Sequence, residues 1–265
     1  MLSSAFNTIL YVPLYNVLIL LTSIVPWADM GIAVVILTIL IKLVILPLTH
    51  KSTKSQVRLR ELNPEIKEIK NKYKDKQEQA KKTMELYKKH GINPFSGCLV
   101  ALVQLPIIIA LYWVFLKGIK IDQSLILASE HTAGYIHKAL LNQDILYSFV
   151  HMPEIIKIKF IGLIDITEKS IVLAVLAGIS QYFQIKLSMP MEGKPTLKNT
   201  GSIKDDLAQS MKFQMRYILP VFVAFFAYSI SAAVALYWLT SNLFTIAHEI
   251  IVKKEVNNLK NNSNK

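Results

Sequence analysis

Long uncharged apolar stretches alternate with polar, basic segments along this chain. A membrane-spanning helix needs roughly 20 mostly apolar residues. The region 217–252 is too long for one ordinary span, so we interpret it as a tight pair of helices that turns near Ser229–Ser231. The pattern therefore predicts an all-α membrane protein with a core of five transmembrane helices, at residues 30–49, 94–117, 170–187, 216–230 and 232–252.

The N-terminal segment, residues 1–29, is also apolar, but Pro13 and Asn16 interrupt it. Two interpretations are open, an interfacial helix or a sixth span. The interfacial helix is favoured, because Asp29 and Gly31 follow so closely that no loop remains for a return crossing. No Lys or Arg precedes Lys42, so the segment lacks the basic start of a secretory signal peptide.

Composition supports a membrane location. The 265 residues are 52% apolar, with a mean hydropathy of +0.38, yet the formal net charge is +12. A large soluble core is the alternative explanation, and the length of the uncharged runs favours a membrane instead. The single cysteine, Cys98, excludes an intrachain disulfide and a cysteine-rich zinc site.

The basic residues predict how the chain is oriented. Thirteen of them lie in 50–93, six in 186–216 and four after residue 252, whereas residues 1–30 hold none. Six more lie in 117–169, where six acidic residues balance them. Cytoplasmic segments of membrane proteins are enriched in Lys and Arg. We therefore expect an outer N-terminus and a cytoplasmic C-terminus, with 1–29 and 118–169 outside and with 50–93, 188–215 and the basic tail 253–265 in the cytoplasm.

The cytoplasmic segment 50–93 predicts an antiparallel helical hairpin that turns at Lys74–Lys76. Its first helix begins at Asn63–Pro64, because a proline at the first position loses no hydrogen bond, and its second ends near Gly91. A narrow apolar stripe with helical spacing runs through both helices: Leu59, Leu62, Ile66, Ile69 and Tyr73, then Ala80, Met84 and Tyr87. The hairpin is either a solvated connector or a docking surface, whose basic residues suit phosphate-rich RNA or lipid headgroups.

Lys42 lies inside the first predicted span, about 4 Å from the midplane at roughly 1.5 Å per residue. A lysine at a helix centre costs about 2.5–3.5 kcal/mol on insertion scales, so it marks a functional site. Snorkelling to the interface is the alternative. The other predicted spans hold no carboxylate except at their ends, such as Glu249, which speaks against a proton relay.

Lys42 is therefore expected to face a hydrated, uncharged cavity walled by polar side chains from several spans. Each of these side chains has an alternative role in hydrogen bonding between helices, and the two aromatic ones also suit an interfacial belt. The candidate walls are Thr38, Gln104, Gln181, Gln184, Tyr237, Trp238, Ser241 and Asn242.

Several stretches resemble the YidC/Oxa/Alb family of membrane protein insertases, in the family's order and over most of residues 30–250. They include GIAVVILTILIKLVILPLTHKSTKS, INPFSGCLVALVQLPIIIALYWVF, LAGISQYFQIKLS and ALYWLTSNLFTIAHEI. The resemblance is to the short bacterial form, without a large extracytoplasmic domain. It implies a five-helix core around a hydrophilic groove that is open to the cytoplasm and to lipid, in the bacterial plasma (inner) membrane.

The resemblance also implies a function. Hydrophobic segments of nascent proteins would enter the positively charged groove and leave sideways into lipid, either alone or beside the Sec translocon. The cytoplasmic hairpin and tail would receive them from the ribosome or the signal-recognition machinery. We expect no enzyme activity, cofactor or metal. The alternatives are a channel or small-solute transporter subunit and an assembly scaffold that does not insert proteins.

Three groove residues follow from the resemblance. The family's groove arginine falls on Lys42, its glutamine on Gln184, with Gln181 as the second choice, and its last-helix tryptophan on Trp238. Lysine in place of arginine keeps the charge, but a desolvated lysine can lose its proton where arginine cannot.

Overall fold

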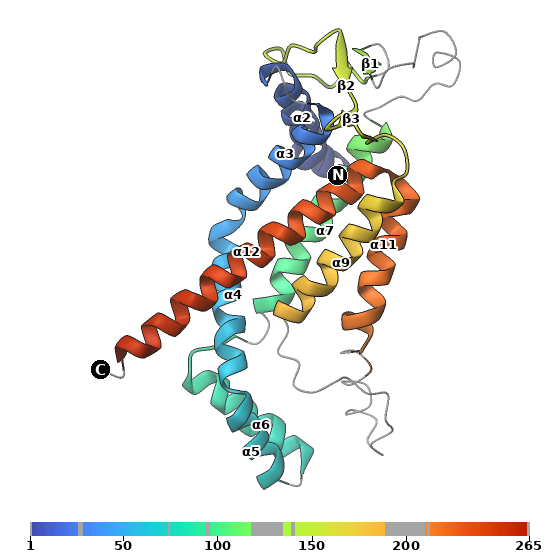
Figure 1. Ribbon diagram of the computed structural model, residues 1–265. Coiled ribbons are helices and arrows are strands. Elements are labelled where there is room, and N and C mark those ends of the chain that lie inside the picture. The colour runs from blue at the N-terminus through green and yellow to red at the C-terminus, as the bar shows by residue number, and fades with distance from the viewer. Residues whose placement is uncertain are drawn as a thin grey trace. The chain divides into compact units, whose positions relative to one another are not determined.

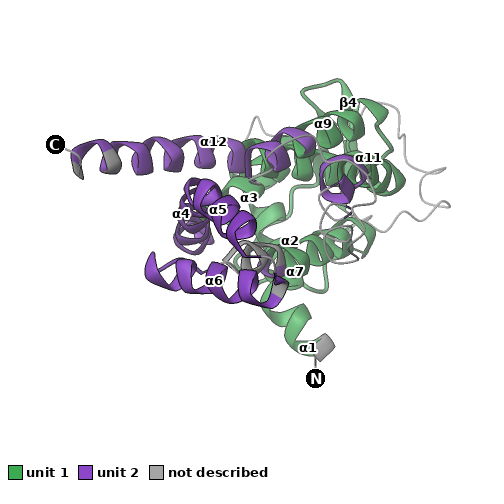
Figure 2. Ribbon diagram, turned by 90° about the horizontal axis from the view of Figure 1, so that it is seen from below, with its two compact units in different colours: residues 1–43, 104–181, 219–243 green, residues 44–103, 182–218, 244–265 purple. Residues whose placement is uncertain are grey.

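A computed structural model describes residues 2–25, 29–73, 75–93, 96–117, 135–138, 141–188, 210 and 213–263. The described chain is mostly helical (Figure 1). It divides into two compact units, which Figure 2 colours separately. Unit 1 comprises 1–43, 104–181 and 219–243, and unit 2 comprises 44–103, 182–218 and 244–265.

Helices make up most of both units. Unit 1 contains α1 (Leu2–Phe6), η1 (Asn7–Tyr11), α2 (Val12–Ile24), nearly all of α3 (Met30–Val44) and α11 (Leu219–Ile230). Unit 2 contains α4 (Leu46–Glu61), α5 (Asn63–Lys72), α6 (Lys76–Lys89) and η3 (Gln214–Ile218). Three helices supply residues to both units: α7 (Ser96–Lys117), α9 (Ile171–Ser188) and α12 (Ala232–Ser263).

Apolar helices lie in all five regions where the sequence predicts spans, and one more lies in the N-terminal segment. Within the described residues, Ser4–Ile24 and Ile171–Ser188 are long and apolar enough to cross a membrane, and α3 with α4 makes a third if the pair counts as one broken span. Leu102–Lys117 and Gln214–Ile230 are shorter apolar helices. The five-span count and the orientation stay predictions, as does the place of residues 1–29.

The first predicted span, 30–49, is not one continuous helix. Helix α3 ends at Val44, and α4 begins at Leu46 with Pro47 in its first turn. Proline has no backbone N–H and its ring clashes with the preceding turn, so a helix restarts there more readily than it continues. The helix that contains the last predicted span is longer than expected, because α12 continues to Ser263 through the basic tail.

The prediction of an all-α chain misses two small antiparallel pairs in the segment 118–169. Strand β1 (Tyr135–His137) pairs with β2 (Ile155–Lys157), and β3 (Lys159–Phe160) pairs with β4 (Ile164–Asp165). Residues 118–134 of that segment lie outside the described part, as do 189–209 of the predicted cytoplasmic loop and Lys74 in the hairpin turn.

The β3–β4 hairpin ties down the start of α3. Asp29 accepts hydrogen bonds through one carboxylate oxygen from the Ile32 N–H at 2.8 Å, which caps the helix, and through the other from the Ile161 N–H at 2.9 Å. Gly31 lies close to the hairpin, where a larger residue would clash with the Phe160 ring. A Cβ at position 31 would lie 2.6 Å from Cδ2 of Phe160. The two contacts hold α3 against the hairpin.

The same segment also fixes the start of α12. Helix α11 ends at Ile230 and α12 begins at Ala232, which confirms the predicted turn near Ser231. The first N–H groups of a helix lack partners within it. Here the Ala232 and Ala233 N–H groups donate to the carbonyl oxygens of Glu168 and Ile166, at 2.6 and 2.9 Å.

The N-terminal helix is fastened to the same segment by Asn16 on α2. Its side-chain N–H donates to the Ile145 carbonyl at 2.8 Å, and its amide oxygen accepts from the Tyr147 N–H at 2.7 Å. Asn16 is 2% exposed, so both polar ends of a buried amide are satisfied by the backbone of residues 145–147.

Helix α5 ends at Lys72 and α6 begins at Lys76, on either side of the predicted turn. The predicted apolar stripe on α6 is wrong in part. Asp75 caps α6 through the Glu78 N–H. The Gln79 side chain reaches across to the carbonyl of Tyr73, whereas Ala80 and Met84 of the predicted stripe are exposed. None of the α5 side chains is buried.

Candidate functional site: polar contacts around Lys42

Lys42 is buried near the end of α3, with 8% of its surface exposed. Its Nζ donates a hydrogen bond to Oε1 of Gln104 on α7, at 3.3 Å. A buried ammonium group needs acceptors because its charged form is poorly solvated away from water. Gln104 offers a neutral amide, so this contact orients the lysine without adding an opposite charge.

The other end of the Gln104 amide contacts the last helix. Its Nε2 donates to the hydroxyl oxygen of Tyr237 on α12. Tyr237 is 2% exposed. Three residues from the predicted set therefore form one chain of hydrogen bonds, Lys42 to Gln104 to Tyr237, that joins α3, α7 and α12 within unit 1.

A second polar cluster joins α9 to α12. The Trp238 indole N–H donates to Oε1 of Gln181 at 2.9 Å. Asn242 donates to the Ser180 hydroxyl at 3.0 Å and to the Ala177 carbonyl at 3.4 Å. Ser180 is missing from the sequence prediction, because a lone serine in an apolar helix gives no distinguishing signal.

Thr38 and Gln184 differ from what the sequence predicts. The Thr38 hydroxyl donates to the Val34 carbonyl of its own helix at 2.6 Å, which is the ordinary bond of a threonine in a helix. Gln184 belongs to unit 2, where its amide donates to the Ser188 hydroxyl at 3.0 Å. The structure thus places Lys42 and seven of the eight candidate wall residues in unit 1, all except Gln184.

Unit 2 contains a buried ion pair that the sequence prediction misses. Arg60 on α4 donates to Oε1 of Glu249 on α12 at 2.5 Å, and the Ser188 hydroxyl donates to the other oxygen at 2.5 Å. The Glu249 side chain is 3% exposed and that of Arg60 15%. The sequence does mark both partners, since Glu249 is an acid among apolar residues and Arg60 is one of only three arginines.

Around this pair, further contacts hold α4 to α12. Val57 packs with Val252 and Val256 in a buried cluster. Lys54 donates to Glu255 at 2.7 Å. This hydrogen bond is the main cause that lowers the pKa of the Glu255 carboxyl below its ordinary value of 4.5, with help from the charges of Lys54, His50 and Arg58.

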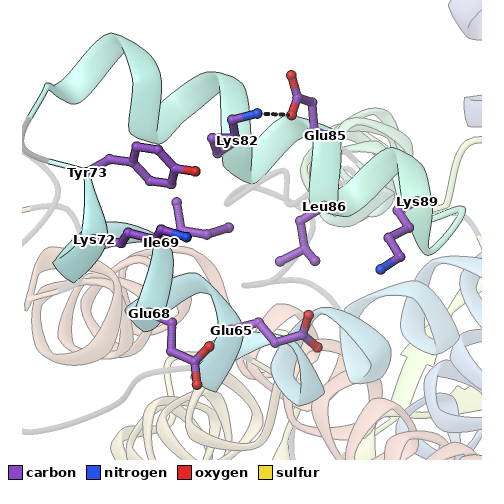
Figure 3. Close-up of a pocket in the computed structure, with 9 residues that line it drawn as sticks. All are labelled: Glu65, Glu68, Ile69, Lys72, Tyr73, Lys82, Glu85, Leu86 and Lys89. Carbon is purple, nitrogen blue, oxygen red and sulfur yellow. Dashed lines mark hydrogen bonds and ion pairs between the residues drawn. The ribbon is translucent and has the colours of Figure 1, made fainter.

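An open hollow of about 360 Å³ lies between α5 and α6 of the hairpin (Figure 3). Ile69, Tyr73 and Leu86 form its apolar part, and Lys82 pairs with Glu85 at its edge, at 2.9 Å. The remaining lining residues are Glu65, Glu68, Lys72 and Lys89. The edge is thus mixed in sign rather than uniformly basic.

The contacts around Lys42 supply one positive charge and several hydrogen-bonding groups. Among the residues that the structure describes, no group of three or more His, Cys, Asp or Glu side chains could hold a metal ion. The arrangement suits the binding of a polar or acidic segment among apolar helices. The class of protein that follows is a helical membrane protein with polar side chains clustered around a buried lysine.

Comparison with known families identifies the group within that class. Residues 20–260 match the family described as 60Kd inner membrane protein. The match covers most of the chain, and the chain belongs to this family. The location of the protein in a membrane follows from this and from its apolar helices.

Individual relatives agree. The chain is 33% identical over 232 residues to a "Membrane protein insertase YidC" of Clostridium tetani (strain Massachusetts / E88), covering 86% of this chain and 84% of the relative. It is 34% identical over 225 residues to a protein of the same name from Francisella tularensis subsp. novicida (strain U112). That match covers 84% of this chain and 32% of the longer relative.

A solved structure, an active YidC insertase with its first transmembrane domain resolved, has a similar fold. The TM-score is 0.51 at 23% identity, over 92% of this chain and 45% of the other. At this identity the likeness concerns the fold alone.

Proposed function

We propose that this chain is a membrane protein insertase. It takes hydrophobic segments of nascent proteins into a hydrated, positively charged groove and releases them sideways into the lipid. One observation carries the proposal: in a chain similar to membrane protein insertases, the buried Lys42 donates to the neutral amide of Gln104, which in turn donates to Tyr237. The proposed groove residues are Lys42, Gln104, Gln181, Gln184, Tyr237, Trp238 and Asn242.

The mechanism follows from the cost of moving polar groups through hydrocarbon. A hydrophilic flank of a nascent span crosses roughly 30 Å of apolar core when it is unaided. Polar side chains and water within the helical core shorten that distance, because each polar group of the flank finds a partner on the way. The charge of Lys42 then attracts acidic flanks and disfavours basic ones.

The proposed topology has its N-terminus outside and its C-terminus in the cytoplasm. Asn16, in the middle of α2, binds the backbone of Ile145 and Tyr147, which lie in the predicted outer segment. If α2 crossed the membrane, Asn16 would lie near the midplane and draw that segment into hydrocarbon with it. The contact therefore supports an interfacial or outer position for residues 1–25.

The hairpin is the proposed receiving surface for the ribosome, the signal-recognition machinery and possible Sec partners. Both of its helices expose basic side chains, among them Lys67, Lys70, Lys81 and Lys88, and the α12 extension adds Lys253 and Lys254. The hollow between α5 and α6 offers apolar contacts within this charged surface. Such a mixture suits protein partners and phosphate groups together.

The test uses single-span substrates made on stalled ribosomes, with a photoreactive residue at position 238 of this chain. We expect crosslinks to the nascent span. We also expect Lys42→Ala to lower insertion of substrates with acidic translocated tails by about tenfold, the order of one lost charge interaction, whereas Lys42→Arg retains it.

Three results would contradict the proposal. If the Lys42→Ala variant supports full insertion in cells depleted of their own insertase, the charge of Lys42 has no part in the mechanism. Absence of nascent-chain crosslinks at position 238 favours an assembly scaffold, and solute flux through proteoliposomes of the purified chain favours a channel or transporter.

A further inference from the structure

The turn of the β3–β4 hairpin exposes two large apolar side chains. Ile161 is 66% exposed, and Leu163 is 83% exposed, the largest value among the large apolar side chains of the described residues. Single exposed apolar residues are ordinary on a protein surface. Here two of them project from one tip with only a glycine between them, so the tip presents an apolar surface that gains free energy when it leaves water.

Ile161 also occupies a strained backbone conformation. The turn Phe160–Leu163 is closed by a hydrogen bond from the Leu163 N–H to the Phe160 carbonyl, at 3.0 Å. Its central residues, Ile161 and Gly162, have φ values of 52° and 74°. Such turns usually carry Asn-Gly or Asp-Gly, because a β-branched side chain is disfavoured at positive φ. A strained isoleucine in an exposed turn indicates a role that asparagine, the better turn residue, would not fill.

The backbone of the tip suits surroundings that contain little water. The Ile161 N–H donates to the Asp29 carboxylate at 2.9 Å, and the Gly162 N–H donates to the Lys159 carbonyl at 3.0 Å. The N–H of Leu163 is bonded within the turn. A backbone N–H that lacks a partner is costly away from water. All three N–H groups of the tip have partners within the protein, so this cost does not arise.

The hairpin lies where the predicted span 30–49 begins. Asp29, which accepts from the Ile161 N–H, also caps the first turn of α3. The Phe160 ring lies against Gly31 of the same turn. The residues that follow the hairpin bond to the first turn of α12, a second apolar helix. These contacts hold the hairpin at the membrane surface where both helices begin, so the lipid is the apolar phase beside the tip.

Two lysines precede the tip on the exposed face of the same segment. Lys157 and Lys159 are exposed and alternate with Ile156 and Ile158, each 3% exposed. Alternate residues of an extended chain share a face. Lys159 lies two residues before Ile161, about 7 Å at roughly 3.3 Å per residue. The polar layer on each side of a bilayer is about 5–7 Å thick. The lysines therefore reach the lipid phosphates when Ile161 enters the hydrocarbon.

We propose that the tip 161–163 is a membrane anchor. The side chains of Ile161 and Leu163 enter the hydrocarbon at the membrane surface where α3 begins. Lys157 and Lys159 bind the phosphates of the lipid headgroups. Because the Ile161 N–H is bonded to the cap of α3, the anchor ties the start of that helix to the bilayer surface. The inference depends on the location of the protein in a membrane and is independent of the insertase function.

The experiment places a nitrobenzoxadiazole fluorophore at the tip. The only cysteine of the chain, Cys98, is replaced by serine, and Leu163→Cys is labelled in the full-length protein. The protein is reconstituted alone in vesicles of phosphatidylethanolamine and phosphatidylglycerol, so that lipid is the only partner present. Fluorescence quenching is measured with iodide on both sides of the membrane, and separately with lipids that carry a nitroxide near the top of the acyl chain.

Two further single-cysteine proteins supply the references. Val175→Cys, at a half-exposed position in the apolar helix α9, reports quenching by lipid. Gln143→Cys, at an exposed polar position, reports quenching by iodide in water.

We expect the label at position 163 to follow the lipid reference. Burial of an apolar group of leucine size favours the embedded state by about tenfold or more, so iodide quenching should be about tenfold weaker than at position 143. Ile161→Asn keeps the turn, because asparagine tolerates positive φ. It removes one of the two apolar side chains, and we expect iodide quenching at position 163 to rise by about threefold.

Two results would overturn the inference. A label at position 163 that iodide quenches as strongly as at position 143, and that the nitroxide lipid leaves unquenched, overturns the anchor and favours a protein partner at the tip. Unchanged quenching in the Ile161→Asn variant overturns the role given to the isoleucine. Both results leave the insertase function standing, because the measurement includes no substrate.

Discussion

Among the described residues, Lys42 and Arg60 are withdrawn from water in different ways. In unit 1, Lys42 donates to the neutral amide of Gln104. In unit 2, Arg60 donates to the carboxylate of Glu249, which the Ser188 hydroxyl also contacts. Both contacts reduce the cost of removing a charge from water, and of the two contacts only the one with Glu249 joins opposite charges.

The difference indicates which of the two serves the architecture. A charge that is paired within the protein joins the helices that carry it, here α4 and α12, and has little attraction left for other molecules. A charge that is solvated by an amide keeps its field and can act on a ligand. Changes to the Arg60 pair should therefore affect stability, and changes to Lys42 should affect function.

The largest expected effect on stability comes from breaking the ion pair. Glu249→Ala leaves Arg60 buried without its carboxylate, and we expect the free energy of unfolding to fall by about 3–5 kcal/mol. Thermal unfolding of the purified protein in detergent, followed by tryptophan fluorescence, measures the change. The double variant Arg60→Met, Glu249→Leu should recover most of the loss, and a single variant as stable as the wild type would contradict the architectural role.

A smaller effect is expected from Lys42→Met in the same measurement. The change relieves the cost of burying a lysine, about 2.5–3.5 kcal/mol, and leaves the Gln104 oxygen without this donor, at a cost of about 1–3 kcal/mol. The two nearly offset each other, so we expect stability within about 1–2 kcal/mol of the wild type. A loss as large as that of Glu249→Ala would mean that both charges serve the architecture alike.

The smallest effect concerns Glu255, whose pKa is lowered chiefly by its hydrogen bond from Lys54. A lowered pKa stabilises the folded state above the ordinary value of 4.5, and this contribution is lost as the pH falls through the lowered pKa. Glu255→Gln should therefore melt slightly below the wild type at neutral pH, with the gap closing in acid. A gap that is independent of pH would exclude this ion pair as its cause.

Much of the helical organisation follows from periodicity and run length. The apolar runs predict α7, α9, α11 and the turn at Ser231, and Pro64 predicts the start of α5. The break at Ile45 was visible as Pro47, but the run around it is apolar on both sides and hid the interruption. The strands β1 to β4 are too short to produce an alternating pattern.

The site was predicted in part, for a physical reason. Polar residues in apolar runs are conspicuous, so the sequence predicts Lys42, Gln104 and Tyr237 as site residues. Sequence alone does not tell which polar group meets which, because that depends on how the helices are rotated. Gln181 and Gln184 are equivalent in the sequence, yet one binds Trp238 and the other binds Ser188.

The hairpin β3–β4 and the residues after it hold the first turns of both α3 and α12, through Asp29, Gly31, Ala232 and Ala233. Any tilt of α3 would therefore turn about this segment, which acts as its pivot. Lys42 lies twelve residues along α3 from Met30, about 18 Å at roughly 1.5 Å per residue, so a tilt of about 10° about the pivot moves it by about 3 Å. A displacement of that size equals the length of a hydrogen bond. A modest tilt of α3 is thus enough to release Lys42 from Gln104.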